Sequence, residues 1–343
     1  MATPDLERTA RALVPPAKGI LAADESTPTL TRRFAALGIE STAETRRAYR
    51  QMLITTPGTA ECISGVILFD ETIRQCADDG TPFPQLLARL GIVPGIKVDR
   101  GTTKLAGAPG EEITEGLDGL RDRLVEYRAL GAKFAKWRAV IRIGPGLPTA
   151  RGIDANAHAL ARYASLCQEE ELVPIVEPEV LIDGDHTIAR CFEVTEATLH
   201  AVFAALHALR VAPEAMLLKP SMVLAGSECP QPAGVTEVAE ATLRCLRRSV
   251  PSAVPGIVFL SGGQSDENAT RHLNAMNARD ERAPWQLSFS YGRALQGAAM
   301  TAWKGDLANL PAGQKAFRQR ARATGAARDG RYTPALEQAV ASR

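Results

Sequence analysis

Charged side chains follow short apolar runs at several places in this sequence, and one lysine is the most informative of them. Lys219 lies in MLLKPSM, with apolar residues before it and Pro220 after it. A free lysine is protonated at neutral pH, but burial and neighbouring cations both favour the neutral amine. Lowering a lysine pKa by about 3 units corresponds to roughly 4 kcal/mol. A neutral Lys219 would attack a carbonyl and form a Schiff base; its alternative role is that of a snorkelling or ion-paired lysine.

Two carboxylates flank Pro178 in the segment VEPE. Alternate residues of a strand point to the same side, so Glu177 and Glu179 are expected to share a face. Like charges at this spacing raise the pKa of one carboxyl, which would let the pair move protons while a carbinolamine forms and loses water. A structural ion pair with lysines is the alternative, and the two roles are compatible.

Glycines and an arginine near the end of the chain predict a phosphate site. The segment Ser261-Gly262-Gly263 ends one apolar run, and Gly292-Arg293 ends the next and opens a helical pattern. Glycines let backbone N–H groups approach an anion, a helix N-terminus attracts it, and arginine binds phosphate through two hydrogen bonds.

These residues need elements that hold them together, and the chain supplies a repeating pattern. Short runs rich in Val, Ile, Leu and Phe alternate with segments of helical periodicity. The eight runs cover residues 18–24, 63–69, 95–99, 134–141, 173–179, 215–222, 256–263 and 286–292. Strands this apolar are typical of parallel sheets buried on both faces. The pattern predicts an α/β fold, an eight-stranded parallel (β/α)8 TIM barrel with outer helices; an open doubly wound sheet is the competing layout.

The polar residues cluster at the carboxyl ends of these predicted strands, where the active site of such a barrel lies. In chain order they are Asp24, Lys97, Lys136 with Arg138, Glu177 with Glu179, Lys219, Ser261, and Gly292 with Arg293. Buried charges cost several kcal/mol each unless they are paired. The set is close to neutral, so mutual pairing can hold it at the mouth of the barrel, with Lys97 and Lys136 as cations beside Lys219.

The helical segments have recognisable starts, and the barrel pattern ends near Trp303. Ser41 and Glu44 form a predicted capping box, and Thr195 is a predicted N-cap. We expect one barrel domain with an N-terminal helical extension over residues 1–303. Residues 304–343 are expected to form a C-terminal helix at 314–323 and a mobile tail.

Composition excludes several classes of protein. The 343 residues carry 40 basic and 39 acidic side chains, a balance that argues against a nucleic-acid binder. No apolar run is long enough to span a membrane, and the N-terminus lacks the apolar segment of a secretory signal. The six cysteines form no C-x-x-C pair and are expected to be reduced, and the five histidines lack metal-ligand spacing. We expect a metal-free protein in the cytoplasm, with the plastid stroma as an open alternative.

The motifs together resemble class I fructose-bisphosphate aldolase over about residues 1–335. The segments that carry the resemblance include KGILAADEST, GAKFAKWRAV, LVPIVEPEVLIDGDH, LLKPSMV, GIVFLSGGQS and FSYGRALQ. The resemblance implies a metal-free (β/α)8 barrel, usually a homotetramer. It also implies reversible cleavage of fructose 1,6-bisphosphate into dihydroxyacetone phosphate and glyceraldehyde 3-phosphate.

The resemblance also implies roles for single residues. Lys219 matches the Schiff-base lysine, Glu177 the acid/base glutamate and Glu179 its partner. Asp24 and Lys136 match residues that position the carbonyl and move protons. The matches to phosphate-binding and nearby substrate positions are Ser261, Gly262, Gly292 and Arg293 toward the C1 phosphate, Ser26, Arg33 and Lys97 toward the C6 phosphate, and Arg138 and Arg46 elsewhere near the substrate.

Two departures from the family pattern carry expectations. Pro28 stands where the family often has glycine, so the loop toward the C6 phosphate is expected to lose an N–H donor. Family members commonly end in a tyrosine that assists proton transfer, whereas this sequence ends in AVASR and its last tyrosine is Tyr332. Schiff-base formation is expected to persist, with slower C–H exchange. Sedoheptulose 1,7-bisphosphate as the main substrate, and a non-catalytic filament-binding scaffold, are the alternatives.

Overall fold

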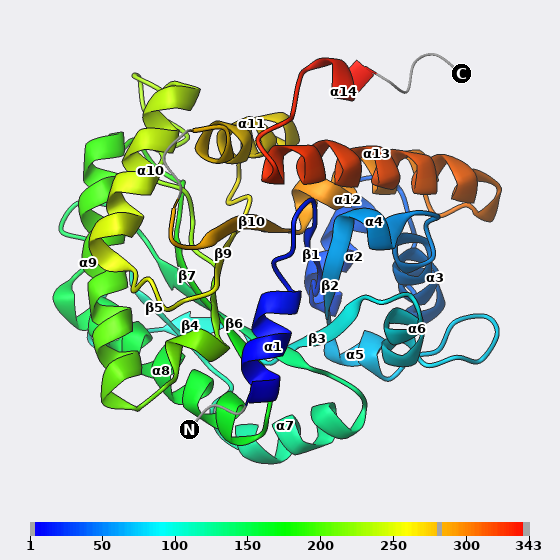
Figure 1. The fold of residues 1–343 in the computed structure, drawn as a ribbon, viewed down its shortest axis with the longest axis horizontal. Coiled ribbons are helices and arrows are strands. Elements are labelled where there is room, and N and C mark those ends of the chain that lie inside the picture. Colours follow the sequence, from blue (N-terminus) through cyan, green and yellow to red (C-terminus); the bar gives the residue numbers. More distant parts are fainter. Residues whose placement is uncertain (1–3, 280–282, 339–343) are drawn as a thin grey trace.

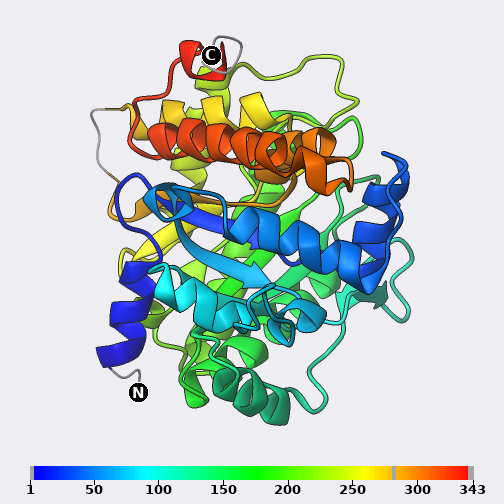
Figure 2. The same ribbon diagram turned by 90° about the vertical axis from the view of Figure 1, so that its right-hand side faces the viewer.

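The computed structural model describes residues 4–279 and 283–338, which form a closed barrel of parallel strands surrounded by helices (Figures 1 and 2). The barrel strands are β1 (Gly19–Ala23), β2 (Ile63–Leu68), β3 (Val93–Lys97), β6 (Phe134–Ile141), β7 (Val173–Val180), β8 (Leu217–Leu218), β9 (Gly256–Phe259) and β10 (Gln286–Tyr291). Each strand pairs in parallel with its neighbours in the order β1-β10-β9-β8-β7-β6-β3-β2. The predicted (β/α)8 barrel is confirmed.

Helices and short connecting elements fill the segments between the strands. The helices are α1 (Pro4–Ala12), α2 (Thr27–Ala35), α3 (Ala43–Ile54), α4 (Thr59–Cys62), α5 (Asp70–Ile73), α6 (Phe83–Arg89), α7 (Leu120–Ala129), α8 (Ala150–Glu169), α9 (Ile188–Ala208), α10 (Val235–Ser249), α11 (Asp266–Asn277), α12 (Arg293–Trp303), α13 (Leu310–Arg328) and α14 (Ala335–Gln338). The remaining elements are two short 3₁₀ helices and one pair of antiparallel strands. The 3₁₀ helices are Pro213–Ala215 and Leu307–Asn309, and the strands are β4 (Thr102–Lys104) and β5 (Glu112–Thr114).

The side chains that point into the barrel are apolar near the amino ends of the strands and polar near their carboxyl ends, which form the mouth of the barrel. Ile20, Phe134, Ile175 and Leu217 belong to one buried cluster, together with Leu6 and other residues of the N-terminal segment. Residues two or four positions further along the same strands share their direction. The inward positions above this apolar layer are therefore Asp24, Lys136 and Arg138, Glu177 and Glu179, and Lys219.

The strand before Lys219 is shorter than the sequence predicts. The apolar run 215–222 predicts one long strand, but β8 contains only Leu217 and Leu218. The Lys219 N–H still donates to the Val176 carbonyl at 2.8 Å, and then Pro220, which has no N–H, ends regular pairing. Lys219 is thus held by the barrel ladder at its last regular position.

Two helix starts differ from their predicted positions. Thr195 is not an N-cap: it lies inside α9, and Thr187 caps this helix by accepting from the Arg190 N–H. Thr42, not Ser41, caps α3, accepting from the Thr45 N–H. In both cases a second hydroxyl residue nearby has the extended backbone that an N-cap requires.

The C-terminal helix is longer and better packed than predicted. The sequence predicts a helix over 314–323, but α13 runs from Leu310 to Arg328 and lies beside α12 and α4 (Figure 1). Gly325, which suggests a break in the sequence, lies inside this helix, where it packs against the Ala17 carbonyl. The predicted mobile tail falls partly on residues 339–343, which lie outside the described residues.

Two further sequence expectations concern membranes and thiols. None of the helices within 4–279 and 283–338 combines the length and hydropathy needed to cross a bilayer. All six cysteines are unpaired; Cys76 and Cys229 are partly exposed and the other four are buried.

Close packing between β3 and β6 gives a stability prediction. A Cβ atom added at Gly95 would lie 2.3 Å from Cζ of Phe134, which the barrel interior cannot accommodate without a shift. We expect Gly95→Ala to lower the free energy of unfolding by about 1–3 kcal/mol, measured by urea denaturation. Gly144→Ala is the control, because its Cβ would meet only Leu147 atoms at 3.8 Å or more. Equal stability of the two variants would contradict this packing.

Candidate active site

The polar mouth of the barrel opens into a cavity of about 450 Å3. Thirteen of the fourteen site residues predicted from the sequence line it: Asp24, Ser26, Arg33, Lys97, Lys136, Arg138, Glu177, Glu179, Lys219, Ser261, Gly262, Gly292 and Arg293. Most of them lie at or just after the carboxyl ends of the strands, as the barrel architecture requires, while Ser26 and Arg33 belong to the start and the last turn of α2. The remaining one, Arg46, is absent from this lining.

Glu177 lies between two lysines at the centre of the cavity. Its Oε1 is 3.1 Å from Lys219 Nζ and its Oε2 is 3.2 Å from Lys136 Nζ. All three residues are buried, each about 3 % exposed. Each oxygen of the Glu177 carboxylate thus faces one of the two amines. One carboxylate therefore reaches both lysines.

The two lysines differ in how many carboxylates surround them. Lys136 Nζ lies 2.7 Å from Asp24, 3.2 Å from Glu177 and 3.9 Å from Asp99. Burial favours the neutral amine, but these three carboxylates outweigh it and raise the pKa of Lys136. Burial likewise opposes the Asp24 carboxylate, yet Lys136 and Lys219 hold its pKa far below the usual value. Lys136 and Asp24 thus remain an ion pair over the physiological range.

Lys219 has only Glu177 as an ion-pair partner among the described residues. One carboxylate therefore lies close to Lys219, whereas three surround Lys136. A buried amine in contact with a single carboxylate is the arrangement that Schiff-base chemistry uses.

Asp99 is a site residue that sequence reasoning missed. Its Oδ1 lies 2.6 Å from Lys97 Nζ in an ion pair, and its Oδ2 accepts from the Arg138 N–H at 3.3 Å. It lines the cavity and joins β3 to β6. The sequence does contain a sign of this role. Lys97 and Asp99 are two residues apart in the run GIKVD, so their side chains are expected to point to the same side of the strand.

Arg138 and Glu179 pair with each other above this layer. The Arg138 guanidinium donates to Glu179 Oε2. Burial opposes the guanidinium charge, and Glu179 outweighs this effect and raises the pKa of Arg138. Arg138 is the more exposed partner, so this pair lies closer to solvent than the buried lysines do.

One cationic end of the cavity is formed by the loops after β9 and β10. Gly262 and Gly263 have positive φ angles of 50° and 83°, which favour glycine at both positions. A Cβ at Gly263 would lie 3.9 Å from Nη2 of Arg293, so this loop adjoins the start of α12. Arg293 makes no ion pair with another described residue. Its guanidinium lies beside the glycine loop and the start of α12, and groups of these kinds bind anions in other proteins.

The other cationic end is at the start of α2. Ser26 is the N-cap of this nine-residue helix, and its Oγ lies 3.1 Å from Thr29 Oγ1 without capping the helix. Pro28 occupies the first turn, where an N–H would have no helical acceptor. The expected loss of a donor is therefore compatible with the helix. Arg33, from the last turn of α2, and Lys97 complete this end.

Glu25, which sequence reasoning also missed, anchors this second end. Its carboxylate pairs with Arg33 and lies 2.8 Å from Arg50 Nη1, and it accepts from Gln296 Nε2 at 2.9 Å. Gln296 also donates to the Ala22 carbonyl at 2.7 Å. This buried network fixes the segment that carries Asp24 and Ser26, and single-sequence spacing contains no sign of it.

Arg46 lies away from the cavity. It is in the first turns of α3, and its guanidinium donates to the Glu71 carboxylate and to Ser41. The residue of α3 that reaches toward the site is Arg50, one turn later, through Glu25. The helix turns Arg46 toward α5 instead of toward the barrel mouth.

The histidines and the last tyrosine also lie outside the cavity lining. Tyr332 is buried and donates to Glu337 Oε1 at 3.0 Å. Within residues 4–279 and 283–338, no group of three or more His, Cys, Asp or Glu side chains is placed to hold a metal ion.

Comparisons with known proteins address the family directly. Residues 5–343 match the family described as fructose-bisphosphate aldolase class-I. The chain is 56 % identical over 333 residues to the "Probable fructose-bisphosphate aldolase class 1" of Xanthomonas campestris pv. campestris, covering 97 % of this chain and 99 % of that protein. The chain belongs to the class I fructose-bisphosphate aldolases. The resemblance inferred from the sequence motifs is confirmed.

Two other relatives agree with this membership. "Fructose-bisphosphate aldolase 6, cytosolic" of Arabidopsis thaliana is 54 % identical over 317 residues, covering 92 % of this chain and 88 % of that one. A fructose-bisphosphate aldolase structure from Plasmodium falciparum, solved with TRAP and a small-molecule inhibitor, superposes with a TM-score of 0.94. It is 48 % identical, over 96 % of this chain and 95 % of that one. The barrel of this class I aldolase is therefore that of its family.

A histidine behind the phosphate loop gives a pH prediction for the aldolase. His272 Nδ1 lies 2.6 Å from Oε1 of Gln264, the residue that follows Gly263. Burial lowers the pKa of His272 from 6.5 to about 4. The unfolded chain therefore binds a proton first as the pH falls, and His272 contributes stability that is lost between pH 6.5 and 4.

We expect the wild type to lose about 2 kcal/mol more unfolding free energy than His272→Asn between pH 7 and pH 5, measured by urea denaturation. The exposed His158 supplies the control, since His158→Asn should keep the wild-type pH dependence. Identical pH dependence in wild type and His272→Asn would contradict a neutral, buried His272.

Proposed function

We propose that this aldolase cleaves fructose 1,6-bisphosphate reversibly into dihydroxyacetone phosphate and glyceraldehyde 3-phosphate through a Schiff base on Lys219. The observation that carries this proposal is the position of Lys219. Its buried amine lies 3.1 Å from a carboxylate, in a cavity with an anion site at each end. A ketose with a phosphate on each terminal carbon matches that distribution of charge.

The first half of the reaction forms the imine. Lys219 gives its proton to Glu177 and adds to the C2 carbonyl, forming a carbinolamine. Glu177 returns a proton to the departing hydroxyl, water leaves, and a protonated imine remains. Glu177 faces this exchange, and the Lys136 ammonium, 3.2 Å from Glu177 Oε2, stabilises negative charge that develops on the C2 oxygen.

The second half breaks the C3–C4 bond. A base removes the proton of the C4 hydroxyl, the C4 carbonyl forms, and the bonding electrons move into the protonated imine to give an enamine. Glu177 is the buried carboxylate already placed at the amine, and it takes this role in the proposal. Asp24 keeps Lys136 charged and in position, and Glu179 with Arg138 closes the polar wall above them.

The phosphates divide between the two ends of the cavity. Ser261, Gly262 and Arg293 hold the C1 phosphate in the proposal, with Gly292 allowing α12 to start beside Ala22. Ser26, Arg33 and Lys97 hold the C6 phosphate. Arg46 receives no substrate contact, because its side chain pairs with Glu71.

The location and assembly are also proposals. The cytosolic Arabidopsis relative supports a cytosolic enzyme, and the family resemblance supports a homotetramer. Sedoheptulose 1,7-bisphosphate remains the substrate to compare, because it adds one carbon between the same two phosphate ends. A lower kcat/KM for fructose 1,6-bisphosphate than for that sugar would reverse the preference proposed here.

Borohydride trapping tests the Schiff base. With dihydroxyacetone phosphate present, borohydride should inactivate the enzyme irreversibly and leave one adduct, which peptide mass spectrometry assigns to Lys219. Lys219→Met should form no adduct and should lose activity, whereas the exposed Lys133→Met serves as a control that behaves as wild type. An active Lys219→Met enzyme, or an adduct on another lysine, would refute the proposal; absence of aldolase activity in both the wild type and Lys219→Met would favour the scaffold.

Two arginine variants test the direction in which the substrate binds. Arg293→Ala should raise KM about 10- to 100-fold for both fructose 1,6-bisphosphate and fructose 1-phosphate, since each loses charge-assisted hydrogen bonds at C1. Arg33→Ala should raise KM only for the bisphosphate, because fructose 1-phosphate has no C6 phosphate. Steady-state kinetics with the exposed Arg162→Ala as control measure both effects. The opposite pattern would mean that the substrate binds in reverse.

A further inference from the structure

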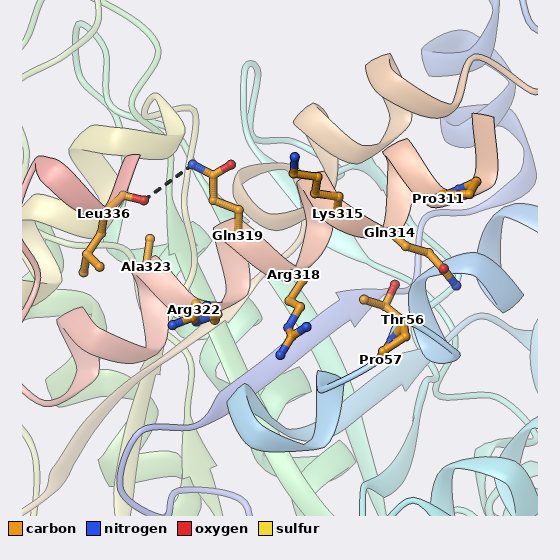
Figure 3. Close-up of a pocket in the computed structure, with 10 residues that line it drawn as sticks. All are labelled: Thr56, Pro57, Pro311, Gln314, Lys315, Arg318, Gln319, Arg322, Ala323 and Leu336. Carbon is orange, nitrogen blue, oxygen red and sulfur yellow. Dashed lines mark hydrogen bonds between the residues drawn. The ribbon is translucent and has the colours of Figure 1, made fainter. Parts of the chain in front are cut away.

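A second cavity lies outside the barrel mouth, between α13 and the loop that joins α3 to α4. Its volume is about 420 Å3, and Figure 3 shows it along the side of α13. Pro57, Pro311 and Leu336 supply apolar surface, and Arg318 and Arg322 supply charge. We call this cavity the α13 groove.

The charge in the α13 groove is unbalanced. Lys315, Arg318 and Arg322 are spaced three and four residues apart, so they are neighbours on the helix surface, where like charges destabilise a helix. None of them makes an ion pair or hydrogen bond to another residue within the described ranges. Arg320 on the same helix, by contrast, is buried and bonded to Glu337 and Thr270. The groove thus concentrates positive charge that the described protein does not neutralise.

The loop opposite α13 is shaped to receive Arg318. Gly58 has a φ of 79°, and a Cβ there would lie 3.1 Å from Arg318 Nε, so the guanidinium packs directly on the glycine backbone. Arg318 extends from α13 on the side of Thr56 and Pro57 (Figure 3). The Arg318 side chain is therefore positioned by packing against the loop and does not extend freely into solvent.

The buried Cys62 thiol, at the end of α4, lies within range of the same arginine charges. Burial and Glu61 raise the pKa of Cys62, while Arg322, Arg318 and Lys18 oppose that shift. Cations from α13 and from the segment before β1 thus converge on one place. Glu61 is the carboxylate that acts there, and it forms no ion pair with either arginine in the described structure.

We propose that the α13 groove binds a phosphate monoester with an apolar or aromatic body. Paired guanidinium groups match phosphate geometry, and binding one dianion there would relieve the repulsion between Arg318 and Arg322. Pro311 and Ala323, both in the lining, are twelve residues apart, about 18 Å along a helix. The groove is therefore much longer than a phosphate ion, and its apolar walls fit an organic body.

Adenosine monophosphate is the probe, with inorganic phosphate as the ligand that lacks a body. Because the barrel mouth also binds phosphates in the proposed function, calorimetric titrations use Arg33→Ala/Arg293→Ala as the background. The groove proposal does not depend on catalysis, so inactivity of this background does not affect the test. We expect adenosine monophosphate to bind this background with one site per chain, and about tenfold or more tightly than phosphate.

Adding Arg318→Ala and Arg322→Ala should weaken that binding about tenfold or more, whereas adding Arg162→Ala, an exposed arginine of α8, should not change it. Unchanged urea denaturation confirms that each variant is folded. Three results would overturn the proposal: no binding to the background, equal affinity after removal of both arginines, or phosphate binding as tightly as the nucleotide. Binding of an acidic peptide in place of the nucleotide would likewise reject the phosphate monoester.

Discussion

The buried Glu177 carboxylate, shared between two lysines, is the interaction on which the active site depends. Charges this deep are costly unless each has a partner, and the innermost layer contains Asp24, Asp99 and Glu177 against Lys97, Lys136 and Lys219. The balance of three and three allows the layer to exist inside a barrel. Its distribution is uneven, because Lys136 has three carboxylates within 4 Å and Lys219 has one, and the proposed chemistry uses this difference.

The barrel supplies the geometry that makes this distribution possible. Alternate residues of β6 point to the same side, so Phe134, Lys136 and Arg138 all face the barrel interior. Moving toward solvent, an apolar layer is followed by a buried charged layer and then by a partly exposed ion pair. The N-terminal segment closes the apolar end with Leu6. The charged layer lines the mouth of the barrel, and the same mouth contains the basic residues Arg33 and Arg293. A phosphate at each end would fix the substrate carbonyl over Lys219.

The barrel and most of the cavity residues could be predicted from the sequence, because the end of a strand and the alternation of its side chains are local properties. Eight apolar runs identified the barrel, and Lys219, Glu177 and Arg293 followed from their positions at strand ends. What sequence reasoning missed depends on contacts between distant segments. Glu25 matters because Arg50 and Gln296 reach it from two helices, and Arg46 pairs with Glu71, 25 residues away. The helix α13 extends beyond its predicted bounds because packing against α12 and α4 compensates for Gly325.

The central claim is that Lys219 is the reactive amine while Lys136 stays charged, and cyanate tests it most directly. Cyanate carbamylates only neutral amines, and peptide mass spectrometry measures the rate at each lysine of the native enzyme. Between pH 7 and 9 we predict clear carbamylation of Lys219 and little or none of Lys136, although both are equally buried. Reaction of Lys136 at the same rate as Lys219, or faster, would contradict this assignment of charge.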